Sequence, residues 1–133
     1  MGLPGLIITG SSGFLGRHLL ERLEDDYRIF GIARRSPAQT GAPIHRNITW
    51  FQVDIADRDA LATAFRKIRE QGGAERVIHL AAHYDFTGED HPQYRRTNID
   101  GMRNVLEECR ELHLKRFVFA SSVAACDFLS GGN

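Results

Sequence analysis

Three glycines near the start of the chain, Gly10, Gly13 and Gly16, stand at equal intervals between an apolar run and an amphipathic one. A glycine turn leading from a strand into a helix exposes backbone N–H groups, and the helix dipole there favours a phosphate. Gly10 would permit the tight turn, Gly13 would leave room for a pyrophosphate, and Gly16 would let the helix pack closely on the sheet. The missing Gly-Lys-Ser/Thr excludes a P-loop. The alternative is an ordinary turn whose glycines serve flexibility.

Two arginines stand where a dinucleotide site normally places an acid, about 20 residues beyond the glycines. This segment reads Ile32-Ala33-Arg34-Arg35, with Ala33 at the acidic position. A guanidinium can bind the 2′-phosphate of NADP through two hydrogen bonds, and no carboxylate stands there to repel it. The segment therefore favours NADP, with NAD as the second choice. The alternatives are that Arg34 and Arg35 are solvated loop charges, or that an arginine stacks on the adenine of NAD.

The elements that must position these residues alternate between strands and helices. Apolar runs predict strands over residues 6–9, 28–33, 48–53, 76–80 and 116–120. Helical spacing predicts helices over 14–24, with Leu15, Leu19, Leu20 and Leu23 on one face, and from the N-cap Asp57 to Gly72-Gly73. A third helix is marked by Ile99, Met102, Val105, Leu106, Cys109 and Leu112. Residues 37–47 read as a loop, and a polar loop runs from His83 to about His91.

This alternation predicts an α/β fold: a doubly wound parallel sheet (Rossmann fold) with five strands in the order 3-2-1-4-5. The length of 133 residues indicates one domain. Lys+Arg and Asp+Glu both number 17, so the charge balance gives no reason to expect nucleic acid or an anionic membrane as a partner. Cys109 and Cys126 form no disulfide framework, and no signal-length apolar segment is present, so we expect a cytoplasmic setting.

Five motifs in chain order resemble the extended short-chain dehydrogenase/reductase family, which includes the NAD(P)-dependent epimerases and dehydratases. The first is TGSSGFLG, with the spacing GxxGxxG rather than GxGxxG. The others are Val53-Asp54-Ile55, His79-Leu80-Ala81-Ala82, the segment from Thr97 to Leu106, and the strand from Phe117 to Ser122. The resemblance implies that residues 1–133 are the NAD(P)-binding part of a longer chain, truncated before the substrate-binding region.

The resemblance also implies roles for individual residues. Asp54 and Ile55 would meet the adenine, Leu80, Ala81 and Ala82 would lie along the cofactor, and Ser122 would be the catalytic serine. The full set of implied cofactor-binding residues is Gly10, Ser12, Gly13, Phe14, Leu15, Gly16, Arg34, Arg35, Asp54, Ile55, Leu80, Ala81, Ala82, Asn98 and Ser121. Asp54 could instead cap a turn, Asn98 could be a helix N-cap or a structural brace, and the two serines could be strand-end hydroxyls.

The reaction implied by the family is hydride transfer at a sugar-nucleotide or other alcohol or carbonyl carbon. A Tyr acts as general acid/base, a Lys lowers its pKa, and a hydroxyl in the position of Ser122 bonds the reacting oxygen. The chain has no Tyr-x-x-x-Lys, and Ala125-Cys126-Asp127 departs from the family pattern after the serine. We therefore expect the chain to bind a dinucleotide without turning over substrate. A non-catalytic NAD(P) sensor or scaffold and a structural α/β domain are the competing interpretations.

Two further expectations concern surfaces. Residues 116–120 would form an open apolar strand edge, which favours a homodimer or aggregation. His83, Asp85, Glu89, Asp90 and His91 gather in one loop. Their spacing favours a solvated loop bordering the substrate pocket over a metal site, and Tyr84 and Phe86 in that loop would either touch substrate or pack.

Overall fold

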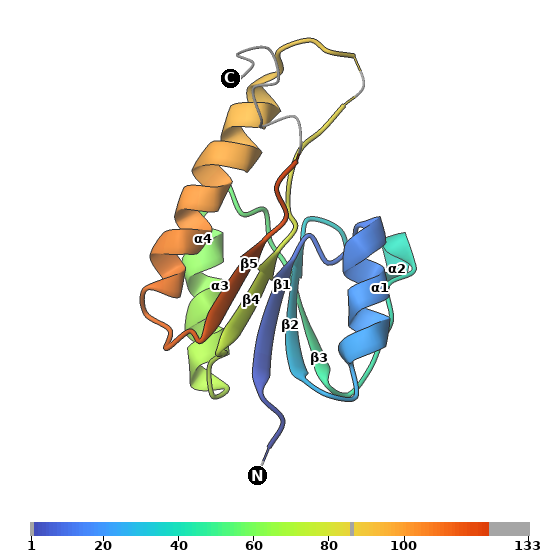
Figure 1. Ribbon diagram of the computed structural model, residues 1–133, viewed down its shortest axis with the longest axis vertical. Coiled ribbons are helices and arrows are strands. Elements are labelled where there is room, and N and C mark those ends of the chain that lie inside the picture. Colours follow the sequence, from blue (N-terminus) through green and yellow to red (C-terminus); the bar gives the residue numbers. More distant parts are fainter. Residues whose placement is uncertain (1, 86, 123–133) are drawn as a thin grey trace, which may run out of the picture.

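The computed structural model describes residues 2–85 and 87–122, and these form a parallel sheet with helices on both faces (Figure 1). The sheet order is β3-β2-β1-β4-β5, and every neighbouring pair is parallel. The strands are β1 (Gly5–Thr9), β2 (Arg28–Ala33), β3 (Ile48–Gln52), β4 (Arg76–His79) and β5 (Arg116–Phe119). The predicted α/β doubly wound fold and its strand order are therefore confirmed.

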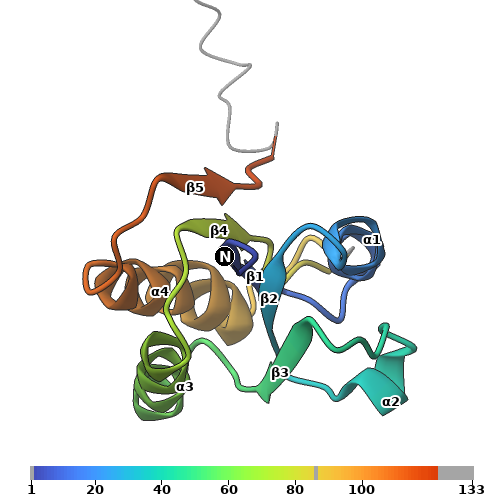
Figure 2. The same cartoon turned by 90° about the horizontal axis from the view of Figure 1, so that it is seen from below.

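The helices divide between the two faces of the sheet. They are α1 (Phe14–Leu23), α2 (Pro37–Thr40), α3 (Arg58–Glu70), the π-helix η1 (Tyr94–Gly101) and α4 (Met102–Cys109). Figure 2 shows α3 and α4 on one face and α1 on the other, with α2 beyond β3. Each face has its own buried cluster: Ile7, Phe30 and Phe65 belong to the larger one, and Leu6, Ile8 and Leu20 to the smaller. The central strands β1 and β2 are thus buried on both sides, as their apolar sequence requires, whereas β5 at the edge of the sheet is largely exposed.

Two predicted helical features are wrong in detail. The segment 37–47 contains the short helix α2, because Ser36 and Gln39 form a reciprocal capping box and Pro37 occupies the first helical turn. Leu15 was expected on the buried face of α1, but it is 59% exposed while Leu20 is fully buried. The buried face of α1 is therefore narrower than the leucine spacing indicates.

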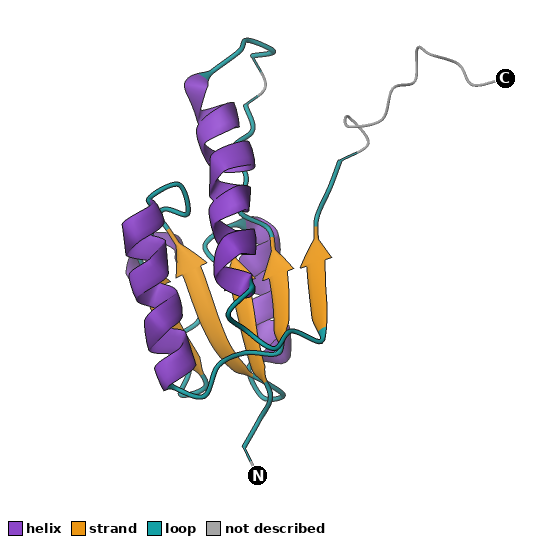
Figure 3. Ribbon diagram, turned by 90° about the vertical axis from the view of Figure 1, so that its left-hand side faces the viewer, coloured by secondary structure: helices purple, strands orange, loops and turns teal. Residues whose placement is uncertain are grey.

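The third helix begins earlier than its apolar spacing predicts and is not a single α-helix. A π-helical segment, η1, runs directly into α4. Figure 3 shows this helix extending past the arrowheads of the strands, so η1 lies beyond the carboxyl ends of the sheet. Val105 and Cys109 are buried against the sheet, whereas Ile99 and Leu106 are 46% and 44% exposed. The long helix therefore reaches the edge of the sheet where ligands bind in such folds.

Candidate functional site

A pocket opens at the carboxyl ends of the central strands. The turn after β1 lines it with Gly10, Ser12 and Gly13, and the end of β2 continues through Arg34 and Arg35. Residues 53–55 after β3, residues 80–82 after β4, and Thr97 of η1 complete the lining. Segments that the sequence places far apart, each expected to contact a cofactor, therefore meet in one cavity.

The three glycines differ sharply in the space around them. Gly10 has φ +69°, and a Cβ there would lie 2.8 Å from the backbone nitrogen of Ala81. A Cβ on Gly16 would lie 2.2 Å from the carbonyl oxygen of Gly10. A Cβ on Gly13 would meet only that oxygen, at 3.4 Å. Gly10 and Gly16 are thus required by the protein's own packing, while Gly13 faces open space in the pocket.

The N-terminus of α1 has the features of an anion site. Gly13 is its N-cap residue and no side chain caps the helix. The Gly13 N–H itself donates to the carbonyl of Gly10 at 3.1 Å, which closes the turn. The first N–H groups of a helix have no partners within the helix, and they attract negative charge together with the helix dipole. Because Gly13 lines the pocket without a side chain, a diphosphate could approach these groups closely, so the residues present fit the expected cofactor.

One hydroxyl holds the wall made by residues 80–82. The Thr9 hydroxyl accepts the backbone N–H groups of Leu80 and Ala81, both at 3.1 Å, and lies 2.7 Å from Nδ1 of His79. Since its lone pairs are used by the two N–H groups, its own proton points to Nδ1. Burial lowers the pKa of His79 from 6.5 to about 4, so the ring is neutral at pH 7 and accepts that proton. This network directs the chain out of β4 and along the pocket.

The two arginines after β2 reach the rim of the pocket from a supported backbone. The carbonyl of Arg34 accepts from the side-chain amide of Gln52 at 3.2 Å, and that of Arg35 accepts from the Trp50 indole at 3.0 Å. Both arginines are exposed, and within the described ranges neither guanidinium makes a hydrogen bond or ion pair. The charge of Arg34 helps to lower the pKa of Asp54. The rim of the pocket therefore offers cationic groups that an anion could engage.

Asp54 has two partners at the same rim. Its Oδ1 accepts the N–H of Ala56 at 3.0 Å, and its Oδ2 accepts from Arg96 at 2.5 Å. Burial raises the pKa of Asp54, but the hydrogen bonds from Arg96 and Ala56 and the charges of Arg96 and Arg34 outweigh burial and leave that pKa below its usual value. Asp54 thus caps the turn, which was the alternative to an adenine contact, and it also lines the pocket.

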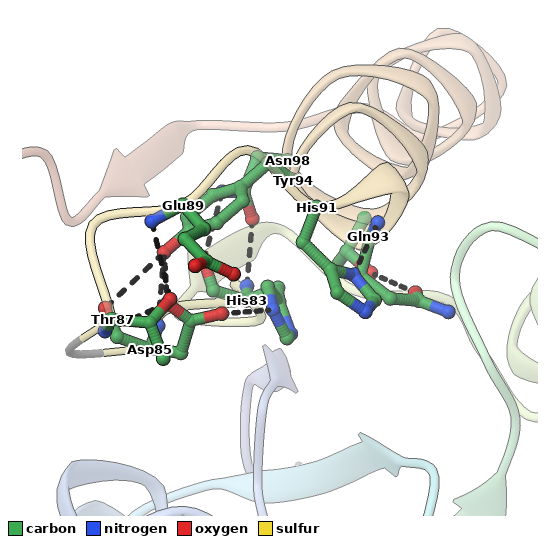
Figure 4. A network of polar contacts seen from close by, with 9 residues as sticks. His83, Asp85, Thr87, Glu89, His91, Gln93, Tyr94 and Asn98 are labelled. Carbon is green, nitrogen blue, oxygen red and sulfur yellow. Dashed lines mark hydrogen bonds and ion pairs between the residues drawn. The ribbon is translucent and has the colours of Figure 1, made fainter.

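Asn98 lies inside η1 and does not cap a helix. Its side chain accepts the N–H of His83 at 2.7 Å and donates to the His83 carbonyl at 3.0 Å. Figure 4 shows this contact within the loop network, where the Tyr94 hydroxyl accepts from the backbone N–H of Asp85 at 3.0 Å. Asn98 therefore braces the segment that follows β4, and it is absent from the lining of the pocket.

The loop from His83 to His91 carries the cluster of titratable side chains that the sequence marks. Within the part of the chain that the structure describes, no three His, Cys, Asp or Glu side chains gather in a way that could hold a metal ion. The rings of His83 and His91 stack with centroids 5.3 Å apart, and Tyr84 is 70% exposed. Phe86 lies outside the described residues.

The remaining candidate residues do not line the pocket. Phe14 and Leu15 are exposed on the first turn of α1, Gly16 lies beneath the turn, and Ser121 and Ser122 are exposed after β5. Cys126 and the segment 125–127 lie outside the described residues. Sequence reasoning missed the pocket-lining residues Ile32, Ala33, Val53 and Thr97. Ile32 and Ala33 are the last two residues of β2 and Val53 directly follows β3, so the carboxyl ends of the strands were a usable signal. Thr97 was marked only as the first residue of the motif that contains Asn98.

Comparison with known proteins agrees with this geometry. The model of the family described as NAD dependent epimerase/dehydratase family matches residues 6–127. The chain belongs to the NAD dependent epimerase/dehydratase family. The suspected relationship to the extended short-chain dehydrogenases/reductases is thereby confirmed.

Members of the epimerase/dehydratase family resemble the chain over only part of their own length. A 3beta-hydroxysteroid-dehydrogenase/decarboxylase (isoform 2) of Arabidopsis thaliana is 30% identical over 129 residues, which cover 87% of this chain and 22% of that protein. The UDP-glucose 4-epimerase of Thermus thermophilus in complex with NAD has a TM-score of 0.75 at 27% identity, covering 89% of this chain and 37% of that one. A uronate dehydrogenase variant of Agrobacterium tumefaciens in complex with NAD has a TM-score of 0.72 at 27% identity, covering 91% and 42%.

The chain spans well under half the length of each of these relatives. Among the described residues, no helix combines the length and apolar character needed to cross a membrane.

Proposed function

We propose that residues 1–133 form the NAD(P)-binding domain of an oxidoreductase, epimerase or dehydratase that acts at a sugar-nucleotide or other alcohol or carbonyl carbon. The observation that carries this proposal is the uncapped N-terminus of α1, which opens through Gly13 into a pocket with cationic groups at its rim. Membership of an NAD dependent family supports it. When bound, the nicotinamide cofactor supplies hydride transfer.

We assign the residues of the pocket to different parts of the cofactor. The turn residues Gly10, Ser12 and Gly13, with the first turn of α1, would bind the diphosphate. Asp54 and Ile55 would contact the adenine, and residues 80–82 would lie along the rest of the cofactor. Ser122 keeps its proposed role as donor to the reacting oxygen of a substrate.

The chain itself is proposed to bind without turning over substrate. The family reaction needs a Tyr and a Lys one helical turn apart, and the three tyrosines, Tyr27, Tyr84 and Tyr94, have no Lys four residues later. The same observation favours a second candidate function, a non-catalytic NAD(P) sensor or scaffold. A Tyr-x-x-x-Lys in the full-length sequence would support the enzyme, and its absence there would support the sensor.

The arginines at the rim lead us to propose NADP as the preferred dinucleotide. Calorimetric titration should show NADP binding about tenfold more tightly than NAD, because a guanidinium can hold the 2′-phosphate that NAD lacks. Arg34→Ala should remove most of this difference by weakening NADP alone. Arg22→Ala, at the far end of α1, is the control and should change neither affinity. Equal affinities for both dinucleotides, unchanged in Arg34→Ala, would contradict the preference for NADP, and no heat with either dinucleotide would contradict the proposed function.

The outer edge of β5 leads us to propose that this chain forms a homodimer. β5 pairs with β4 on one side, and no strand of the described residues pairs with its other side. Val118 and Phe119 are 43% and 54% exposed, and unpaired apolar edges invite further pairing. Sedimentation velocity on the 133-residue chain should show concentration-dependent association, and Val118→Lys should abolish it. A wild-type chain that stays monomeric at high concentration would rule out this dimer.

A further inference from the structure

The π-helix η1 and the start of α4 contact the turn between β3 and α3 through an ion pair, a hydrogen bond and close packing. Arg96 of η1 pairs with Asp54 at 2.5 Å. The Asn104 side chain donates to the carbonyl of Ile55 at 2.9 Å, and a Cβ on Gly101 would lie 2.7 Å from Cδ1 of Ile55. Three contacts, spaced along two turns of the helix, thus hold the wall of the pocket that contains Asp54 and Ile55.

Arg96 fixes the orientation of the Asp54 carboxylate. Each oxygen of this carboxylate accepts one hydrogen bond, Oδ1 from the backbone N–H of Ala56 and Oδ2 from the side chain of Arg96. Two anchored oxygens leave the side chain little rotational freedom, and each oxygen keeps a lone pair for another donor. The charged groups that act on this ion pair are Arg34, across the pocket rim, and Asp57, at the start of α3.

We propose that Arg96 is a positioning residue for the adenine half of the dinucleotide, which it serves by holding the Asp54 carboxylate ready to accept from the adenine amino group. This rests on the proposed function. Thr97, the next residue, lines the pocket itself, and Asn98 holds His83. π-Helical segments are rare and are frequently found at functional sites, which agrees with η1 contributing to the pocket.

The test compares ligands that contain the adenine half with one that lacks it. In the full-length protein, Arg96→Met should raise the Kd of ADP-ribose and of NAD about tenfold, the size expected for losing a charge-assisted hydrogen bond. The Kd of nicotinamide mononucleotide should stay unchanged. Arg95→Met is the matched control, since Arg95 is the exposed neighbour on η1 and makes no hydrogen bond or ion pair with the described residues. An equal loss of affinity for ADP-ribose and for nicotinamide mononucleotide in Arg96→Met would overturn the proposal.

Two further readouts separate positioning from a merely structural role. Arg96 helps to keep the pKa of Asp54 low, so the carboxylate stays ionised as the pH falls. In Arg96→Met that pKa rises, and the acid-side loss of ADP-ribose affinity should begin at higher pH than in the wild type. In an Asp54→Asn background, Arg96→Met should cause no additional loss; a second tenfold loss there would overturn the proposal.

A second variant, and ligand binding by the wild-type protein, guard against misfolding and against failure of the proposed function. Should Arg96→Met fail to fold, Arg96→Lys is used instead, because it keeps the charge with fewer donors; it should raise the Kd of ADP-ribose by a smaller factor, and a wild-type Kd would count against the proposal. A wild-type protein that binds neither NAD nor ADP-ribose would instead refute the proposed function.

Discussion

Gly16→Ala is expected to lower the free energy of unfolding by about 3 kcal/mol, the upper range for overpacking a tight contact, and to remove dinucleotide binding. The added Cβ would lie 2.2 Å from the Gly10 oxygen and 2.8 Å from the Ser11 Cα. Both are backbone atoms, so α1 must move away from the turn and its N-terminus must leave the pocket. Urea denaturation measures the first effect and calorimetry with NAD or NADP the second.

Gly13→Ala separates binding from folding at the same turn. Gly13 has φ −77°, which alanine adopts freely, and its Cβ would have only one neighbour, at 3.4 Å. The free energy of unfolding should therefore change by no more than about 0.5 kcal/mol. Dinucleotide affinity should nevertheless fall about 100-fold, because the methyl group would occupy the approach of the diphosphate. A folded Gly13→Ala protein with wild-type affinity would show that the diphosphate does not bind at this turn.

Thr9→Val is expected to destabilise the protein by about 3 kcal/mol, because it leaves polar groups without partners in a buried site. The N–H of Ala81 would lose its acceptor, the N–H of Leu80 would keep only the backbone carbonyl of Thr9 at 3.3 Å, and Nδ1 of the buried His79 would lose its donor. Thr9→Ser keeps the hydroxyl and should retain most of the stability. Urea denaturation of the three proteins checks this; a Thr9→Val protein as stable as Thr9→Ser would mean that the hydroxyl network contributes little.

Local patterns were enough to predict the sheet and much of the pocket. Apolar runs mark all five strands to within a residue at either end, because the strands of a parallel sheet carry nearly continuous apolar sequence. The turn after β1 and the rim at Arg34 follow from spacing along a strand–turn–helix unit. Asp57 caps α3 as predicted, by accepting the N–H of Ala60.

Features that depend on tertiary placement were not predictable in the same way. The ion pair of Arg96 with Asp54 joins residues 42 positions apart, and it exists only because η1 extends past the sheet. No apolar period distinguishes a π-helix from an α-helix over eight residues. Thr97 reaches the pocket for the same reason, so its role became visible only with the course of this helix.

The π-helix also sets the rotational phase between the two halves of the long helix. An α-helix advances about 100° per residue. Deleting one residue between Asn98 and Gly101 would therefore rotate the part of the helix N-terminal to the deletion by roughly that angle about the helix axis. Val105 and Cys109 would stay in the core, while Arg96 would swing away from Asp54 and Asn98 from His83. A single-residue change in length would therefore uncouple the cofactor pocket from a helix that remained fully folded.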